Sequence, residues 1–337
     1  MRHRPATCGP VGMWMLSLAL LLPSGSIRAA GERPEIPVAA RQAYDQSDYR
    51  RAVEELKAAA AQDPRNGDVQ LWLAKSYLEL QEYDAAINSA EKAIAIDPNN
   101  SVYHEWLGKA YGEKASRTSM FSAMGLAKKS HREFESAVRL DERNYSARQA
   151  LIEFDCSAPG MVGGGEDKAK PEIEKLHGLD AAEWHYAEGN CRRQKKDYSG
   201  ADQEFQKALE SQPKSAGLIY DIGDYALKRD QADRLMEVAD LGEKAAPEDP
   251  RGDFYRATGL ILKNANLPQA QHLLEQYLRR APRRDSYPRY AVAHEWLGRL
   301  YEQKGDQDAA VKEYQKALQL EPKNKNAREA LKRLGQG

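Results

Sequence analysis

Prolines recur in this sequence at an interval of 34 residues. Pro64 and Pro98 are 34 residues apart, and so are Pro213 and Pro247. Each of them closes an alanine-rich or polar stretch, and the four stretches read AAAAQDPRN, AIAIDPNN, ALESQPKS and EKAAPED. An internal period of this length is typical of repeat proteins, in which one small supersecondary unit is stacked many times. Because a single unit cannot bury its apolar side alone, the period predicts a stack that is stabilised by contacts between neighbouring units.

The residues within one period resemble the tetratricopeptide repeat, a helical hairpin with the pattern W-x2-L-G-x2-Y, then A-x3-F, then P. The best match lies in residues 291–324, which place on the family's spacing Leu297, Gly298, Tyr301, Gly305, Ala310, Tyr314, Ala317 and Pro322. Residues 67–100 match with Leu73, Ala74, Tyr77, Tyr83, Ala86, Ala93 and Pro98. The resemblance implies an all-α fold, a right-handed superhelical solenoid of antiparallel helix pairs.

This template divides the chain into about eight units and a closing helix. The expected order is repeats 1–3 at residues 33–144, with an insertion near 115–126 in repeat 3, an irregular unit at 145–181 with a glycine-rich loop at 159–165, repeats 5–7 at 182–282, a basic linker at 283–290, repeat 8 at 291–324, and a C-terminal capping helix at 325–337.

The pentapeptide HEWLG occurs twice, beginning at His104 and at His294. These two residues and His185 all take the fourth place of a first helix, and each has a glycine four residues later. A zinc peptidase of the H-E-x-x-H type needs a second imidazole at the positions that Gly108 and Gly298 occupy here. We therefore interpret the motif as a repeat register, in which the small glycine lets two helices approach closely.

The first thirty residues show the three parts of a secretory signal peptide. A basic end at Arg2 and Arg4 precedes an apolar run over residues 13–22, and the small pair Ala29 and Ala30 follows. The run is too short to span a bilayer comfortably, although a retained membrane anchor is the alternative. We expect cleavage after Ala29 or Ala30, no membrane span in the mature chain, and an exported product that is periplasmic or secreted.

After that cleavage only Cys156 and Cys191 remain. Export makes one bridge between them permissible. Two buried thiols are nevertheless the favoured interpretation, because a free cysteine behaves as a small apolar residue. There is no CxxC motif and no Cys/His cluster with zinc spacing, so no metal site is expected.

Composition and motifs argue against catalysis, cofactors and nucleic acid. The 337 residues carry a formal net charge of -1, without a long run of like charge at either end, so no nucleic-acid partner is expected. No GxSxG motif occurs, and no strand pattern would carry one. The glycine-rich loop SAPGMVGGGEDKAK lacks the Lys-Ser or Lys-Thr of a phosphate-binding loop, which favours a flexible turn. We therefore expect a protein that is not an enzyme and that holds no cofactor.

Two irregular segments leave alternatives open. The insertion is apolar on one side through Met120, Phe121, Met124 and Leu126. It either extends the hairpin and packs on a neighbour or presents its Met and Phe side chains to a partner, or less plausibly to a membrane. Residues 279–290, which include the linker, gather five arginines and two tyrosines, and the linker is either a solvated connection or a grip for an acidic protein or polysaccharide.

The family resemblance also implies a binding surface, the inner wall formed by places two, five, nine and twelve of each first helix. The candidate partner-binding residues on this wall are Leu71, Lys75, Glu105, Lys109, Gln149, Glu153, Tyr186, Asn190, Arg193, Tyr220, Asp224, Glu295 and Arg299. We expect a protein or peptide partner, held as an extended segment or a helix in the concave groove. The alternative is a scaffold in a cell-envelope or secretion assembly, which would contact partners through its edges and insertions.

Overall fold

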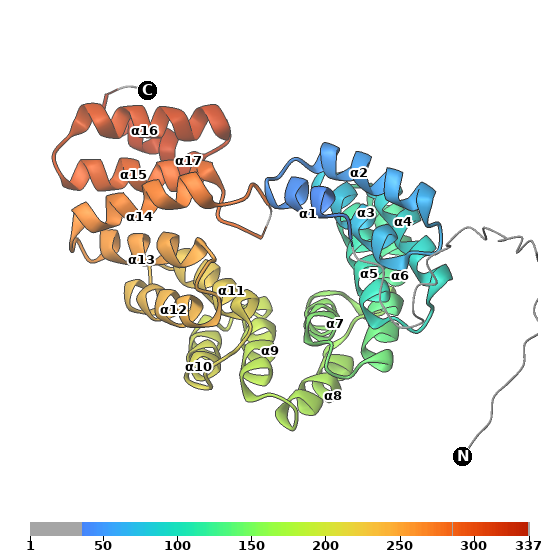
Figure 1. Ribbon diagram of the computed structural model, residues 1–337. Coiled ribbons are helices and arrows are strands. Elements are labelled where there is room, and N and C mark those ends of the chain that lie inside the picture. Colours follow the sequence, from blue (N-terminus) through green and yellow to red (C-terminus); the bar gives the residue numbers. More distant parts are fainter. Residues whose placement is uncertain (1–35, 285, 336–337) are drawn as a thin grey trace, which may run out of the picture. The chain divides into compact units, whose positions relative to one another are not determined.

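The computed structural model describes residues 36–284 and 286–335, and within these ranges it contains helices and no strand (Figure 1). The predicted signal peptide at residues 1–30 lies outside the described residues. The expectation of an all-α fold of stacked helices is confirmed. Residues 35–337 form one compact unit, and everything below concerns that unit.

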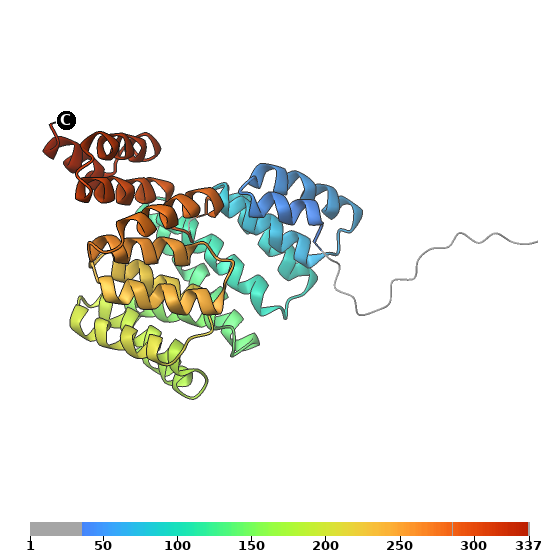
Figure 2. The same cartoon turned by 60° about the vertical axis from the view of Figure 1, so that its left-hand side comes forward.

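Seventeen α-helices follow one another along the described chain, and most of them pack as antiparallel neighbours (Figure 2). Their bounds are α1 Val38–Asp45, α2 Tyr49–Gln62, α3 Gly67–Glu79, α4 Tyr83–Ile96, α5 Ser101–Ser116, α6 Met120–Leu140, α7 Tyr145–Ser157, α8 Glu166–His177, α9 Ala181–Gln194, α10 Tyr198–Glu210, α11 Ala216–Leu227, α12 Ala232–Ala245, α13 Arg251–Leu262, α14 Leu267–Arg280, α15 Tyr290–Gln303, α16 Gln307–Leu320 and α17 Lys325–Arg333. A short 3-10 helix, Gly160–Val162, lies between α7 and α8.

Asparagine and aspartate side chains set where many of these helices begin. Asn66, Asn100, Asn144 and Asn324 follow the proline or acidic turns of the repeat, and each accepts a hydrogen bond from a backbone N–H in the first turn of the next helix. Such caps satisfy amide groups that have no partner inside the helix. The repeated turn therefore ends one helix pair and starts the next.

Helices of a pair approach closely where a glycine faces an aromatic ring. A Cβ atom added to Gly108 would lie 2.8 Å from the ring of Phe134, and one added to Gly298 would lie 2.5 Å from the ring of Tyr314. Gly189 meets Phe205 in the same way, at 2.6 Å. The interpretation of these glycines as close-packing positions is confirmed.

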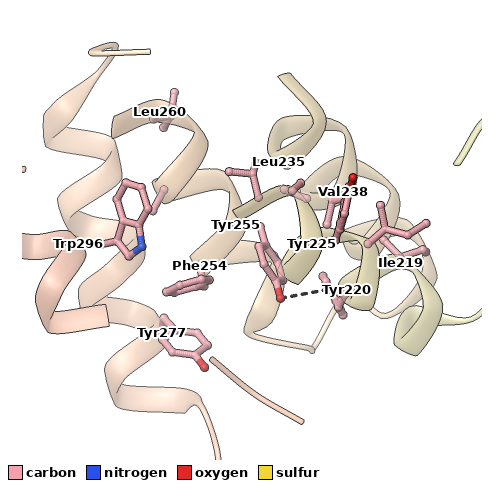
Figure 3. Packing of buried hydrophobic residues seen from close by; sticks show 14 of the residues in the cluster. Ile219, Tyr220, Tyr225, Leu235, Val238, Phe254, Tyr255, Leu260, Tyr277 and Trp296 are labelled. Carbon is pink, nitrogen blue, oxygen red and sulfur yellow. Dashed lines mark hydrogen bonds between the residues drawn. The ribbon is translucent and has the colours of Figure 1, made fainter. Parts of the chain in front are cut away.

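The largest buried cluster runs through several consecutive pairs, from α10 to α15 (Figure 3). Tyr220 stacks on Tyr255 with ring centroids 5.6 Å apart, and Phe254 contacts Tyr277 at 5.1 Å. The Tyr255 hydroxyl donates to the Tyr220 carbonyl oxygen at 3.1 Å. Aromatic side chains thus join one pair to the next, which is how a stack of hairpins becomes one core.

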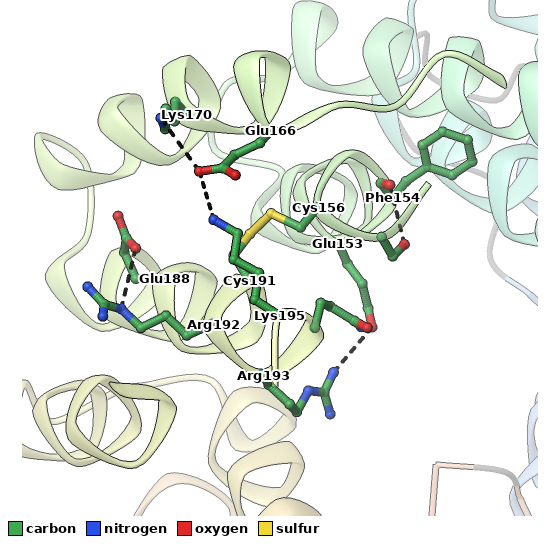
Figure 4. Close-up of a disulfide and its surroundings, with 12 residues drawn as sticks. Glu153, Phe154, Cys156, Glu166, Lys170, Glu188, Cys191, Arg192, Arg193 and Lys195 are labelled. Carbon is green, nitrogen blue, oxygen red and sulfur yellow. Dashed lines mark hydrogen bonds and ion pairs between the residues drawn. A yellow bond between two sulfur atoms is a disulfide. The ribbon is translucent and has the colours of Figure 1, made fainter. Parts of the chain in front are cut away.

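Cys156 and Cys191 form a disulfide that links α7 to α9, with their Cα atoms 5.4 Å apart (Figure 4). The prediction of two unbridged thiols was wrong. The two cysteines are 35 residues apart, about one repeat period, and both lie in the first helix of a pair. Stacking of successive first helices therefore brings them together.

The basic linker does not behave as a solvated connection. The Arg283 backbone N–H donates to the Ser47 hydroxyl at 2.7 Å, and the Tyr49 hydroxyl donates to the Arg283 carbonyl oxygen at 2.9 Å. The Arg284 guanidinium donates to Asp45 at 2.8 Å and lies over the Tyr44 ring at 4.5 Å. We call this contact between residues 44–49 and 283–284 the clasp; Figure 1 shows the linker beside α1.

Candidate functional site

The first helices of successive pairs lie beside one another and form one side of the stack. Direct contacts join α3 to α5, α7 to α9, α11 to α13, and α13 to α15. We call this side the A-helix face. All of the candidate partner-binding residues belong to helices of this set, so their side chains can be compared on one surface.

A row of alternating cations and indole rings crosses the A-helix face from α1 to α5. The Arg41 guanidinium lies 5.7 Å from the ring of Trp72, and the Lys75 ammonium lies 5.0 Å from Trp72 and 4.7 Å from Trp106. The Lys109 ammonium also lies 4.7 Å from the Trp106 ring. Both indole rings are partly exposed. We call these five residues the Trp–Lys stripe. A cation that lies over the face of an aromatic ring is attracted to it electrostatically. The side chains of the stripe therefore hold one another in place before any partner binds.

Lys75 is the centre of this stripe. Burial lowers the pKa of its ammonium group, although the Glu105 charge opposes the effect. Among the described residues the Lys75 ammonium lies against the two indole rings, whereas Lys109 also donates to Glu105 and to the Ser146 hydroxyl. A desolvated ammonium without a close carboxylate gains from an added negative charge.

Both lysines of this stripe were predicted as partner-binding residues, whereas Trp72 and Trp106 were not. A signal was present in the sequence, since the sixth place of three units holds Trp72, Trp106 and Trp296, and a cation follows three residues later each time. In the last of these units the Arg299 guanidinium lies 4.1 Å from the Trp296 ring. On a helix a spacing of three places two side chains on one face.

The histidine of the repeated motif ties the first helix of a pair to the second. His104 Nδ1 is 2.7 Å from a Glu133 carboxylate oxygen, and His294 Nδ1 is 2.6 Å from a Glu313 oxygen. His185 makes the same contact with Glu204 at 2.7 Å. The repeat-register interpretation of the motif now has a physical reason, because the imidazole holds the hairpin together.

The glutamate of the motif connects its unit to the next one. Glu105 accepts from the Ser146 hydroxyl of α7 at 2.7 Å, and Glu295 accepts from the side-chain amides of Asn324 and Asn326 at 3.0 and 2.8 Å. Both glutamates are buried. These two members of the predicted binding wall are therefore engaged inside the stack.

The middle of the A-helix face is acidic. Burial raises the pKa of Glu183 to about 7, and burial raises the pKa of Asp221 to about 6. The side-chain amide of Gln149 donates to Glu183 at 2.8 Å, and the Tyr186 hydroxyl donates to Asp221 at 3.1 Å. Gln149 and Tyr186 were predicted as partner-binding residues, whereas Glu183 and Asp221 were not.

Further predicted residues pair with one another or with neighbours around this region. Arg193 donates to Glu153 at 3.3 Å, joining α9 to α7. Asp224 accepts from the Tyr255 hydroxyl at 2.6 Å. Asn190 is buried beside Tyr186. The structure thus brings the central predicted residues together as a hydrogen-bonded layer between successive first helices.

Two predicted wall residues lie in the core instead. Tyr220 is 1% exposed, and its ring fills the space that Gly242 leaves on α12, where an added Cβ would lie 2.5 Å from the ring. Leu71 is buried against Ala93 and Tyr103. Because neither side chain reaches the surface, the expectation that Leu71 and Tyr220 line an open wall was wrong.

A cavity of about 1170 Å³ opens on the A-helix face and is lined by α5, α11, the linker, α15 and α17. It brings together the predicted residues Asp224, Glu295 and Arg299 with Trp296 and Arg333. Its lining mixes both signs of charge. Among the described residues no group of His, Cys, Asp and Glu side chains is arranged to hold a metal ion. None of the helices described is long and apolar enough to cross a membrane.

The arrangement was compared with known proteins. Family models of the tetratricopeptide repeat match residues 43–110 and residues 262–325. No curated protein matches the chain.

Similar solved structures include MamA, which is 21% identical over 51% of this chain and 93% of its own, with a TM-score of 0.40. A tetratricopeptide repeat protein from Parabacteroides merdae is 13% identical over 88% of this chain and 96% of its own, with a TM-score of 0.40. The pilF protein of Pseudomonas aeruginosa is 15% identical over 79% and 97%, with a TM-score of 0.44. The two matches to family models show that the chain contains tetratricopeptide repeats, at residues 43–110 and 262–325.

Proposed function

We propose that this chain is an exported, non-catalytic protein that binds a polypeptide segment on its A-helix face. Tetratricopeptide repeats generally act as protein-interaction modules. The observation that carries the proposal here is the Trp–Lys stripe, which places two partly exposed indoles and three cations in one continuous row.

The chemistry of the stripe suits the capture of a chain segment. Tryptophan is enriched at the energetic centres of protein interfaces, because it contributes a large area with few rotatable bonds. Lys75 is already held between two rings, so ordering it on binding costs little side-chain entropy. Since the stripe crosses three consecutive first helices, it suits an extended segment or a helix rather than a small molecule.

Export is supported by two independent features of the chain. The first thirty residues have the composition of a signal peptide. Cys156 and Cys191 are joined as a disulfide, a bond that persists in oxidising compartments and is rare in the cytosol. We therefore place the mature protein in the periplasm or outside the cell.

The test begins with partners recovered from the exported fraction and re-measured as purified pairs. Trp106→Ala is expected to weaken the affinity by about tenfold or more, the size typical of a central interface tryptophan. Tyr198→Ala is the matched control, because Tyr198 is an exposed aromatic with Arg229 stacked 5.1 Å away, but it lies on a second helix, α10. If Trp106→Ala and Tyr198→Ala change the affinity equally little, the A-helix face is not the binding surface.

The alternative is a scaffold that contacts partners through the basic linker and the insertion near residues 115–126. The linker is the weaker of these two candidates. Arg283 and Arg284 are engaged in the clasp, so they are less available to an acidic partner than the sequence suggested. Deletion of the linker therefore tests the clasp as well as an edge. Loss of an enzymatic turnover in Glu183→Gln, with the fold intact, would contradict the non-catalytic part of the proposal.

A further inference from the structure

The α5–α6 hairpin is longer than the others. The difference in length follows from the sequence separation of the repeated histidine–glutamate pair. The pair spans 19 residues in the hairpins of His185 and His294, but 29 residues from His104 to Glu133. Because the contact itself is unchanged, all ten extra residues lie between these two side chains. Compared with α15 and α16, three of them lengthen α5 and seven lengthen α6, which is about 4 Å and about 10 Å of helix.

The end of this longer hairpin is apolar and uncovered. Met120 is 78% exposed and Phe121 is 85% exposed, at the first turn of α6. Further along α6, Leu126 packs against the buried cluster that runs from α1 to α5. The fold therefore uses the deeper part of the insertion and leaves two large apolar side chains at the tip in water, which costs free energy without adding a contact.

The same segment carries charge of one sign. Residues 114–132 contain Lys114, Arg117, Lys128, Lys129 and Arg132 and no acidic residue, although the whole chain has 51 acidic and 50 basic side chains. Lys114 pairs with Asp84, and Lys129 lies over the Tyr111 ring. Lys128 and Arg132 are exposed and form no ion pair with any described residue. Arg117 lies at the cavity on the A-helix face.

We propose that the tip of the α5–α6 hairpin docks on the surface of an anionic lipid bilayer. Met120 and Phe121 enter the boundary between headgroups and acyl chains. Lys128 and Arg132 lie seven and eleven residues after Phe121 and so on the same side of α6, and they face lipid phosphates where this side of the helix lies along the surface. An apolar point flanked by basic residues is the pattern of peripheral membrane contact, and each basic residue near such a surface adds attraction.

A bilayer fits this tip better than an acidic protein does. The acidic groups of a protein surface would satisfy the cations but would leave Phe121 in water unless a matching pocket were present. A bilayer offers both an apolar medium and negative charge without any shape requirement, and a single projecting turn has little shape to be read. Docking through Met120 and Phe121 uses no residue of the Trp–Lys stripe, so this function is additional to the one proposed above.

The experiment uses the chain that starts at residue 31, because the unit of residues 35–337 contains every described helix. Co-sedimentation is measured with vesicles of phosphatidylglycerol and phosphatidylcholine in equal parts, and with vesicles of phosphatidylcholine alone. We expect binding to the anionic vesicles, with at least about tenfold weaker binding to the neutral ones. Met120→Ser with Phe121→Ser, and Lys128→Glu with Arg132→Glu, are each expected to reduce the anionic binding by about tenfold.

Met161→Ser is the matched control, because Met161 is 72% exposed but is followed by the acidic pair Glu166 and Asp167. It is expected to bind like the unchanged chain. Circular dichroism checks that each variant is folded. Trp106→Ala is also expected to bind vesicles normally, so a failure of the tip and a failure of the Trp–Lys stripe give different results.

Insertion of the tip has its own readout. In the chain from residue 31, Cys156 and Cys191 are bonded to each other, so Phe121→Cys adds the one free thiol for an environment-sensitive fluorophore. Anionic vesicles are expected to shift its emission to the blue. The proposal is overturned if anionic and neutral vesicles bind equally, if the tip variants bind unchanged, if the emission does not shift, or if the tip is needed only for capture of a protein in the absence of lipid.

Discussion

Each residue of HEWLG makes a different contact. The histidine binds the second helix of its pair, the glutamate binds the next unit, and the tryptophan meets a cation three residues later. The leucine is buried, and the glycine admits an aromatic ring from the second helix. At the scale of single residues, the motif recurs because it solves one packing problem in several places.

Two glycines that both lie inside helices are expected to respond in opposite ways to substitution by alanine. Gly298→Ala should lower the free energy of unfolding by about 1 kcal/mol, because its Cβ would lie 2.5 Å from the packed Tyr314 ring. Gly125→Ala should raise it by up to about 1 kcal/mol, since nothing lies within 4 Å and alanine favours a helix. Urea unfolding followed by circular dichroism measures both. Equal shifts of the same sign would contradict close packing at Gly298.

Backbone conformation at the turns gives a second prediction at this scale. Lys196 has a φ of 63°, whereas the corresponding turn before α16 uses Gly305 with a φ of 77°. Lys196→Gly should therefore raise the free energy of unfolding by about 1 kcal/mol, and Gly305→Lys should lower it by a similar amount. No atom lies near a Cβ at Gly305, so the loss would come from backbone strain alone. Thermal unfolding of the two single variants provides the comparison, and shifts in the same direction would refute it.

At the scale of elements, α7 and α9 are joined by more than apolar packing. The Cys156–Cys191 bond and the hydrogen bond from Gln149 to Glu183 both connect these two first helices across the irregular α8. The glycine-rich loop leads into α8 at this point, and Gly165 has a φ of 142°. The least regular unit of the chain is thus the one that is cross-linked.

Reduction of the disulfide should lower the free energy of unfolding substantially. The bond closes a loop of about one repeat period, for which the chain-entropy model gives about 4 kcal/mol, with 2–4 kcal/mol typical of measurements. Cys156→Ser with Cys191→Ser should reproduce the effect of reductant, and reductant should then have no further effect on that variant. Thiol titration of the unfolded, unreduced chain from residue 31 should detect no free thiol. Two titratable thiols would contradict the bond.

The buried Glu183 should make this contact depend on pH. Burial raises its pKa to about 7, against an opposing hydrogen bond from Gln149, while the ordinary value is 4.5. The folded chain therefore holds the proton of Glu183 more tightly than the unfolded chain does. The resulting contribution to the free energy of unfolding is fully present below about pH 4.5 and is lost as the pH rises to about 7.

Glu183→Gln keeps the hydrogen bond and removes the titration, so it should flatten the stability profile across that window by an amount on the order of 2–3 kcal/mol. Denaturant unfolding at half-unit steps of pH measures the profile. Glu153→Gln is the control, since Glu153 is an exposed carboxylate on the neighbouring helix α7. The assignment fails if the two variants have the same profile.

For the molecule as a whole, the sequence predicted the helical stack because prolines, glycines and alanines recur at a regular spacing, and each unit of this kind needs them for its turn and its close helix contacts. It also predicted the face on which Lys75 and Lys109 lie, since a spacing in residues becomes a direction on a helix. It missed the burial of Tyr220, which depends on the space left by Gly242 on another helix. It missed the clasp as well, because a contact between residues more than 230 positions apart leaves no trace in a local pattern.

The clasp is unusual for a stack of repeats, in which each unit normally touches only its neighbours. Arg284 donates to Asp45 and covers Tyr44, so the linker before the last helix pair holds the first pair of the described chain. Such a contact couples the stability of distant units. Arg284→Asp should weaken it by about 1–2 kcal/mol, since the variant loses a partly buried guanidinium and adds repulsion from Asp45.

Cross-linking can report whether the clasp is closed in solution. Ser47→Cys with Arg283→Cys places two thiols at a pair of residues whose Ser47 hydroxyl and Arg283 backbone N–H are 2.7 Å apart, and oxidation should join them. Arg284→Asp should slow this cross-link by about tenfold, and adding Asp45→Arg should restore part of the rate because opposite charges then face each other again. Arg50→Asp, on an exposed side chain of α2, should leave the rate unchanged. A rate that does not depend on residue 284 would mean that the ionic contact does not hold the first and last units together.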